Sequence, residues 1–322
     1  MENFKNKFAK FAVKFGQRYT AIVIKRTKGK RAEYLSVFGV KFDAVGKIRR
    51  KWANLAPEFK RIHKMIAIYF SSTGNTKHCV ERFIERLGGD IPAVSIEDEA
   101  CGELLKRHGD IILAYPVYFS DLPQIVREFI CENSANFRGK NVFIIATMEI
   151  FSGDGAGCAA RILRRAGAKI TGGVHVKMPA FILDVAIFSY SAQKNERVIK
   201  EANAKLEHAS EAFAAGKPPQ EGLSPLCRIA GLLGQRLWMK IWDKTPFARR
   251  KPSLDTARCN GCGECARSCP MQNIKITHGK ARFGERCTIC YRCVNRCRQK
   301  AITILGKAEN LQKSVAAEFK DI

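Results

Sequence analysis

The residues best suited to chemistry in this chain are eight of its thirteen cysteines, which fall in two short motifs. Each motif has the spacing C-x2-C-x2-C-x3-C, and the members are Cys259, Cys262, Cys265, Cys269, Cys287, Cys290, Cys293 and Cys297. A tight loop of this spacing lets three thiolates converge on one face of a cube of iron and sulfide, so the fourth ligand must come from elsewhere. The pattern therefore predicts two [4Fe–4S] clusters.

Zinc and disulfides are the alternative uses of such cysteines. Structural zinc sites use separated pairs of C-x2-C, without a third cysteine two residues further on. Disulfide frameworks suit small secreted chains, and no secretory signal is visible in this sequence. The remaining five cysteines lie far apart and are expected to be small core residues, namely Cys79, Cys101, Cys131, Cys158 and Cys227.

The doubled motif closely resembles the bacterial two-cluster ferredoxins, in which the fourth ligand of each cluster comes from the other motif. The resemblance implies one cluster held by Cys259, Cys262, Cys265 and Cys297, and a second held by Cys287, Cys290, Cys293 and Cys269. Pro270 follows the first motif as in that family, whereas Arg298 stands where the second proline would be. This departure concerns the backbone of the second loop and not its ligands.

A second chemical feature is a hydroxyl-rich turn between an apolar strand pattern at residues 65–70 and a helical pattern at residues 77–87. The turn consists of Ser71, Ser72, Thr73, Gly74, Asn75 and Thr76. At such a junction, backbone N–H groups and the positive end of the helix point at an anion, and hydroxyl groups complete the cradle. The turn predicts a phosphate site, with an ordinary polar turn as the alternative. It is not a Walker loop, because the Gly-x4-Gly-Lys spacing is missing.

This turn resembles the phosphate loop of flavodoxins, Ser/Thr-x-x-Gly-x-Thr, here carried by Ser71, Gly74 and Thr76. The resemblance implies bound FMN with its phosphate in the turn. It also implies that the flavin ring lies between the loops that follow the third and fourth strands.

Two of those loops contain residues that the resemblance places at the flavin ring. Tyr118 or Phe119 would stack on the ring, and backbone groups near Ser152 and Gly153 would touch its polar edge. Packing in a lid or in the core is the alternative use of the two aromatic residues. The sequence identifies no catalytic residue.

Strand and helix patterns alternate after residue 65. Further strands are expected at residues 91–96, 110–115, 141–148 and 168–176, and helices at residues 122–132, 156–165 and 191–215. Five strands alternating with helices predict an α/β fold with a doubly wound parallel sheet. The flavodoxin-like strand order 2-1-3-4-5 is expected, with the ligand at the carboxyl ends of strands 1 and 3.

The chain divides into five segments by composition. We expect a basic extension over residues 1–64, an FMN-binding domain over 65–215, a linker with an amphipathic bridging helix over 216–251, a small α+β two-cluster ferredoxin domain over 252–306, and a C-terminal helix over 307–322. The bridging helix is predicted at residues 224–243 from an apolar stripe that begins with Leu226, Ile229 and Leu233.

More than half of the net charge of +26 lies in residues 1–64, which hold 18 Lys/Arg and 4 Asp/Glu, giving +14. Phe4, Phe8, Phe11 and Phe15 recur there at helical spacing, which predicts a basic amphipathic helix. Such a helix suits peripheral contact with an anionic membrane or an acidic partner; an ill-ordered extension and nucleic-acid contact are the alternatives. We expect no specific recognition of nucleic acid. No apolar run approaches the roughly 20 residues of a spanning helix.

The whole arrangement resembles a family of flavodoxin–ferredoxin fusion proteins of anaerobic bacteria, which is generally assigned to electron transfer. Independently of the resemblance, clusters move one electron at a time and flavin accepts one or two. We therefore expect a cytoplasmic relay between two [4Fe–4S] clusters and FMN that serves a separate redox partner. The alternative functions are an FMN-dependent reductase of its own quinone, nitro compound or disulfide, fed by the clusters, and a scaffold without flavin.

Basic residues surround the cysteine motifs. Residues 255–305 hold ten Lys/Arg and three Asp/Glu. We expect Arg292, Arg296 and Arg298 to lie nearest the clusters and to raise their potentials, and the basic residues together to attract an acidic redox partner. The alternative is that these charges only solubilise a small domain.

Overall fold

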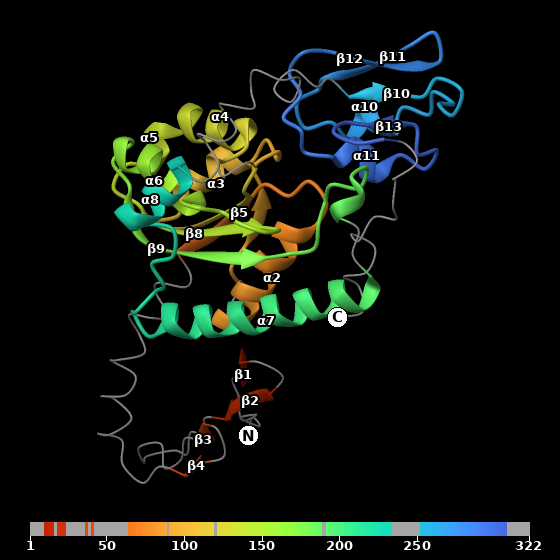
Figure 1. The fold of residues 1–322 in the computed structure, drawn as a ribbon. Coiled ribbons are helices and arrows are strands. Elements are labelled where there is room, and N and C mark those ends of the chain that lie inside the picture. Colours follow the sequence, from red (N-terminus) through yellow and green to blue (C-terminus); the bar gives the residue numbers. More distant parts are fainter. Residues whose placement is uncertain are drawn as a thin grey trace, which may run out of the picture.

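The computed structural model describes residues 64–88, 90–118, 121–188, 191–233 and 252–307, together with four short strands between residues 10 and 41. A five-stranded parallel sheet lies at the centre (Figure 1). Its strands are β5 (Met65–Tyr69), β6 (Ala93–Ser95), β7 (Asp110–Pro116), β8 (Asn141–Met148) and β9 (Lys169–Lys177). They pair in the order β6-β5-β7-β8-β9. The predicted order 2-1-3-4-5 is therefore confirmed.

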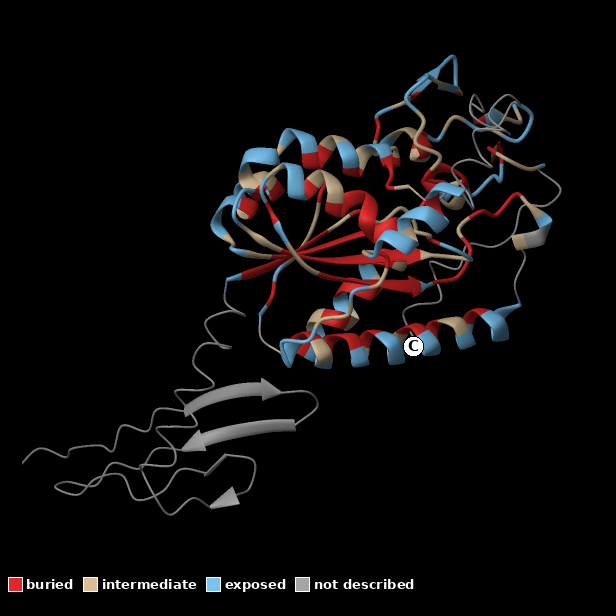
Figure 2. Ribbon diagram, turned by 60° about the vertical axis from the view of Figure 1, so that its left-hand side comes forward, coloured by how far each residue is buried: buried red, intermediate tan, exposed pale blue. Residues whose placement is uncertain are grey.

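Helices cover both faces of this sheet. They are α2 (Asn75–Leu87), α3 (Cys101–Arg107), α4 (Gln124–Glu132), α5 (Ser134–Phe137), α6 (Gly155–Arg165) and α7 (Ala192–Ala214). On β8, Phe143 and Ile145 pack with α2 and α7, whereas Val142 and Ile144 pack with α3 to α6. Successive side chains of a strand point to opposite faces, so a strand covered on both sides is apolar throughout (Figure 2).

The C-terminal domain is a small α+β unit, as predicted. Strand β10 (Ser253–Leu254) pairs with β13 (Ile302–Thr303), and β11 (Ile274–Thr277) forms a hairpin with β12 (Lys280–Phe283). Two short helices, α10 (Glu264–Ser268) and α11 (Arg292–Arg296), lie between these strands in sequence. Ile182 and Leu183, which follow β9, belong to the apolar core of this domain. The two domains are therefore packed together, with the C-terminal one beyond the ends toward which β8 and β9 run (Figure 1).

The N-terminal extension differs from its prediction. Lys10–Phe15 form strand β1, which pairs antiparallel with β2 (Arg18–Val23), so a helix over Phe4–Phe15 is wrong for this part; residues 4–9 lie outside the described residues. Phe11 and Phe15 are four residues apart, a spacing that also fits one face of a strand rich in aromatic and β-branched residues. Two further strands, β3 (Ser36–Val37) and β4 (Val40–Lys41), pair with each other.

The described part of the predicted bridging helix is α8 (Pro225–Gly231), which lies against α6. Its apolar stripe does not pack between the domains, because Leu226, Ile229 and Leu233 are exposed. Residues 234–251 lie outside the described residues, as does the helix predicted at 307–322 apart from its first residue, Lys307. Among the described helices, none combines the length and the apolar character needed to cross a membrane.

We predict that residues 1–63 are dispensable for folding of both domains. Among the described strands, β1–β4 pair only with one another, whereas the carbonyl of Lys64 accepts hydrogen bonds from the amides of Gly109 and Asp110. A chain that begins at Lys64 should therefore hold iron and flavin in the same amounts as the full chain and unfold at a similar temperature. Loss of either cofactor, measured by iron and flavin content after anaerobic purification, would contradict this.

Candidate functional site

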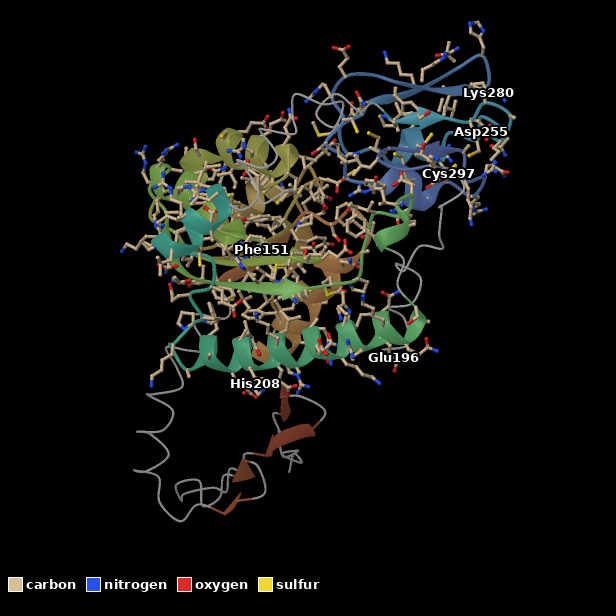
Figure 3. The ribbon with its side chains drawn as sticks, viewed as in Figure 1. Phe151, Glu196, His208, Asp255, Lys280 and Cys297 are labelled. Carbon is tan, nitrogen blue, oxygen red and sulfur yellow. The ribbon has the colours of Figure 1, made fainter. Side chains whose placement is uncertain are left out.

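The first cysteine-lined cavity gathers four thiols from both motifs. Cys259, Cys262, Cys265 and Cys297 line it, together with apolar side chains that include Ile276. Three of the four come from the first motif, and Cys297 comes from the second (Figure 3).

The loop of the first motif is held by its neighbours. Lys280 donates from Nζ to the carbonyls of Thr256 (2.9 Å) and Cys259 (2.5 Å). Gly261 has a φ of +72°, and a Cβ there would lie 2.3 Å from the carbonyl oxygen of Gly279. The hairpin turn that follows β11 therefore packs so closely on the motif that only glycine fits.

A second cavity gathers the other four thiols of the two motifs. Cys269, Cys287, Cys290 and Cys293 line it together with Tyr291. Each cavity thus holds three cysteines of one motif and the last cysteine of the other, which is the exchange that the sequence predicts. Assignment of these thiols as cluster ligands remains a prediction.

The thiols of both cavities have surroundings that suit cluster ligands. Backbone amides donate to sulfur from Asn273 to Cys269 (3.3 Å), from Ile289 to Cys287 (3.4 Å) and from Ala301 to Cys297 (3.3 Å). Hydrogen bonds of this kind tune cluster potentials. Burial raises the pKa of Cys290 to about 11. Because a metal ligand must be a thiolate, this site needs the positive charge of iron to hold it deprotonated.

The spacing of these thiols bears on the zinc and disulfide alternatives. All thirteen cysteines are free. In the described residues, no three cysteine, histidine or carboxylate side chains are placed to share a single metal ion. Thiolates on one zinc ion would lie within about 4 Å of each other, since Zn–S bonds are about 2.3 Å long. In a cubane each thiolate binds a different iron atom, so cluster ligands need not lie within reach of one ion.

A third cavity lies where the strands of the parallel sheet end. It is lined by Ser71, Ser72, Thr73, Asn75, Thr76, Pro116, Val117, Thr147, Met148, Glu149, Met178, Pro179 and Phe181. Five of the six predicted phosphate-turn residues are in this set, and they join β5 to α2. The sixth, Gly74, is the N-terminal cap of α2 with a φ of +105°, a conformation that glycine adopts without strain.

The turn is fixed by hydrogen bonds within it and to neighbouring segments. The amide of Gly74 donates to Ser71 Oγ (3.1 Å), and Asn75 Nδ2 donates to the carbonyl of Pro179 (2.8 Å). Thr76 and Thr147 share a hydrogen bond between their hydroxyls (2.8 Å). The first amides of a helix have no intrahelical acceptor, so those of α2 suit an anion such as the FMN phosphate.

The residues predicted at the flavin ring are only partly brought together. Tyr118 is buried, and its hydroxyl shares a hydrogen bond with Ser72 Oγ (3.1 Å); burial raises its pKa well above the usual range. Ser152 does not line the cavity, because its hydroxyl lies 2.5 Å from His175 Nδ1. Gly153 packs against Gly231 instead. Phe119 lies outside the described residues.

Phe181 is a cavity residue that the sequence analysis missed. It follows β9, and its ring lies 5.1 Å from that of Tyr118 and 5.7 Å from that of Tyr291, measured between centroids. The available signal was the apolar run at residues 178–183, which belongs to none of the predicted elements. Because Tyr291 lines the second cysteine cavity, Phe181 touches the surroundings of both sites.

Two family matches agree with these sites. Residues 66–157 match the family described as flavodoxin domain, and residues 251–308 match the family described as 4Fe-4S dicluster domain. An uncharacterised ferredoxin of Methanocaldococcus jannaschii is 35% identical over 63 residues, covering 17% of this chain and 40% of the relative. An uncharacterised protein of the same organism is 36% identical over 67 residues, covering 21% and 26%. The match therefore spans less than half of either relative.

Similar solved structures include flavodoxins. One from the domain Archaea is 17% identical, with a TM-score of 0.32, and covers 46% of this chain and 98% of its own. The two-electron reduced flavodoxin of Megasphaera elsdenii is 22% identical, with a TM-score of 0.33, and covers 44% and 98%. The order of the five strands, rather than these likenesses, establishes the fold.

We predict that Cys297→Ser damages the cluster held mainly by the first motif. The full chain should contain about eight iron atoms, and the variant about four, because one of two [4Fe–4S] clusters loses a ligand. The remaining cluster should keep its electron paramagnetic resonance spectrum in the reduced state. Cys131→Ser is the matched control, since Cys131 is exposed and outside both motifs. Loss of the second motif's cluster instead would contradict the exchange.

We predict that Thr73→Val with Thr76→Val weakens FMN binding. Each lost hydroxyl should cost about 1 kcal/mol of binding, roughly fivefold to tenfold in Kd, because a phosphate acceptor loses its donor. Riboflavin, which lacks the phosphate, should bind the variant and the parent chain alike. Fluorescence titration of the flavin-free chain measures both constants. Unchanged FMN affinity would place the phosphate elsewhere.

Proposed function

Since the chain carries a flavodoxin domain and a 4Fe-4S dicluster domain, we propose that it relays electrons between two [4Fe–4S] clusters and bound FMN for a separate redox partner. The clusters supply one-electron transfer, and the flavin can accept one or two electrons. What this chain contributes is the placement of the three cofactor sites, their insulation from water and the surface that meets the partner.

The observation that best supports the relay is the position of Cys290. This thiol, from the second cavity, is 8% exposed and belongs to the apolar core of the flavodoxin domain, together with Tyr118. The hydroxyl of Tyr118 in turn reaches Ser72 in the phosphate turn. The second cysteine cavity therefore adjoins the predicted flavin site, and it is the natural site for exchange of electrons with the flavin.

Aromatic rings fill the space between these two sites. Phe181 lines the flavin cavity and packs edge-on against Tyr291, which lines the second cysteine cavity. Such packing excludes water and keeps the distance between the two sites short. In the proposed relay these side chains fix the geometry of the internal transfer step.

The first cysteine cavity is the proposed port for the external partner. Eight of the ten basic residues between 255 and 305 are exposed, and they include Arg258 and Arg298, which flank Cys259 and Cys297 in sequence. A basic surface attracts an acidic carrier and speeds its encounter. The cytoplasmic location expected from the sequence is part of this proposal, because free thiols persist in reducing compartments.

Arg292 does not belong to that surface, contrary to its expected role beside Arg296 and Arg298. It is 9% exposed and forms an ion pair with Glu97 of the flavodoxin domain, with Nη1 2.5 Å from Oε2. Arg296 is exposed, and its Nη1 lies 3.5 Å from Glu264 Oε1. The spacing of the second cysteine motif gave no indication that helix α11 faces the flavodoxin domain.

The relay predicts that flavin reduction by a one-electron donor requires the second cluster. Cys287→Ser with Cys293→Ser should remove that cluster and slow flavin reduction strongly, because the first cluster then has no neighbour on the path. Stopped-flow absorbance of the anaerobic FMN-loaded chain measures the rate. An unchanged rate would contradict the relay. Turnover of a quinone without any partner protein would favour the alternative reductase.

The acidic-partner proposal predicts a charge effect at the first cluster. Arg258→Glu with Arg298→Glu should slow electron exchange with an acidic ferredoxin about tenfold or more at low salt, and less at high salt. Lys169→Glu with Lys217→Glu is the control with the same charge change, on exposed residues of the flavodoxin domain. Equal rates for both pairs, or rates independent of salt, would contradict a docking surface at the first cluster.

A further inference from the structure

Arg292 is the one described guanidinium that reaches from the C-terminal domain into the phosphate turn. Nη2 donates to the carbonyl of Ser71 (2.9 Å), and Nε donates to the carbonyl of Ser72 (3.3 Å). Nη1 donates to the carbonyl of Ser268 (3.2 Å) in its own domain. Glu97 receives one hydrogen bond from each terminal nitrogen, of 2.5 and 2.6 Å.

These contacts use the whole hydrogen-bonding capacity of the side chain. A guanidinium has five N–H donors, and Arg292 has five acceptors in the geometry above. The guanidinium carbon Cζ of Arg292 also lies 5.6 Å from the ring centroid of Phe70, the residue before the turn. A lysine could not replace it, because an ammonium has three donors and no fork.

The contacts with Ser71 and Ser72 determine how the phosphate turn presents its amides. In a trans peptide the C=O and N–H groups point in opposite directions. With the carbonyls of Ser71 and Ser72 turned toward Arg292, the amides of Ser72 and Thr73 point away from it. Both residues line the flavin cavity. Arg292 therefore fixes the orientation of two N–H groups that belong to residues lining this cavity.

The same residue belongs to the second cysteine motif, since Arg292 stands between Cys290 and Cys293. We infer that Arg292 is a positioning residue that couples the phosphate turn to the second cluster: it orients the turn for the FMN phosphate only when the ferredoxin domain is docked. Coupling between two binding events is reciprocal, so FMN should also affect the second cluster. This inference rests on the proposed binding of FMN at the turn.

The local backbone supports a docking role for this segment. In the first motif Gly261 and Gly263 have φ values of +72° and +78°, and the matching positions of the second motif are Ile289 and Tyr291, at +55° and +61°. Non-glycine residues adopt this conformation rarely and only under strain. Tyr291 uses its side chain for docking, because its hydroxyl donates to Asp184 Oδ1 (2.7 Å) of the flavodoxin domain.

The test is the affinity of the flavin-free, cluster-loaded full chain for FMN and for riboflavin, measured anaerobically. Arg292→Gln should weaken FMN by about tenfold or more, the size of a lost charge-assisted hydrogen bond, and change riboflavin little. Arg292→Lys should behave like Arg292→Gln. Arg298→Gln, an exposed arginine of the same segment, is the control and should bind both flavins like the parent chain.

A second measurement is the midpoint potential of the second cluster with and without FMN. FMN should shift this midpoint potential in the parent chain but not in Arg292→Gln. A general loosening of the fold would not produce that difference. If Arg292→Gln loses its iron, the same comparison is made with Arg292→Lys and with Glu97→Gln. Equal loss of FMN and riboflavin affinity, full rescue by lysine, or unchanged FMN affinity would overturn the coupling alone. A parent chain that takes up no FMN would overturn the proposed function as well.

Discussion

The ion pair between buried Arg292 and the more exposed Glu97 is the interaction on which the relation between the two domains depends. Removing a guanidinium and a carboxylate from water is costly unless both are paired and hydrogen-bonded. Here the arginine side chain is 11% exposed and the glutamate side chain 26%. A shifted docking position would leave the arginine buried without its five acceptors, so the pair admits only one register of the ferredoxin domain on the phosphate turn.

The hydrogen bond from Tyr291 to Asp184 is the second contact that anchors the two domains to each other. Asp184 is fully buried and accepts from Tyr291, from the amide of Ile304 (2.6 Å) and from the amide of Leu305 (3.1 Å). Tyr291 adopts a left-handed backbone conformation that glycine would adopt without strain. A glycine there would lack the side chain that reaches Asp184. The two cysteine motifs therefore have the same backbone path but different partners, and only the second is built to face the flavodoxin domain.

The features that could be predicted from sequence are those that depend on close neighbours in the chain. Each of these features can be recognised within about ten residues: the cysteine spacing, the turn at residues 71–76 and the apolar strands. The docking contacts join residues far apart in sequence, 195 residues for Arg292 with Glu97 and 107 for Tyr291 with Asp184. Nothing local distinguishes Arg292 from the exposed Arg298, so charge counting placed both on the surface. The strand at Lys10–Phe15 was missed for another reason, since the four-residue step from Phe11 to Phe15 fits both a helix and one face of a strand.

Permanent docking changes what the ferredoxin surface has to do. Two separate carriers must find each other by diffusion and orient at each transfer, which costs translational and rotational freedom. In this chain Glu97 with Arg292 and Asp184 with Tyr291 hold the second cysteine cavity against the flavodoxin domain, so that the transfer in the proposed relay would be intramolecular. The exposed basic residues around the first cavity are not consumed by this internal contact. In the proposed relay they remain available to an outside partner, and each electron exchanged with that partner would need only one encounter.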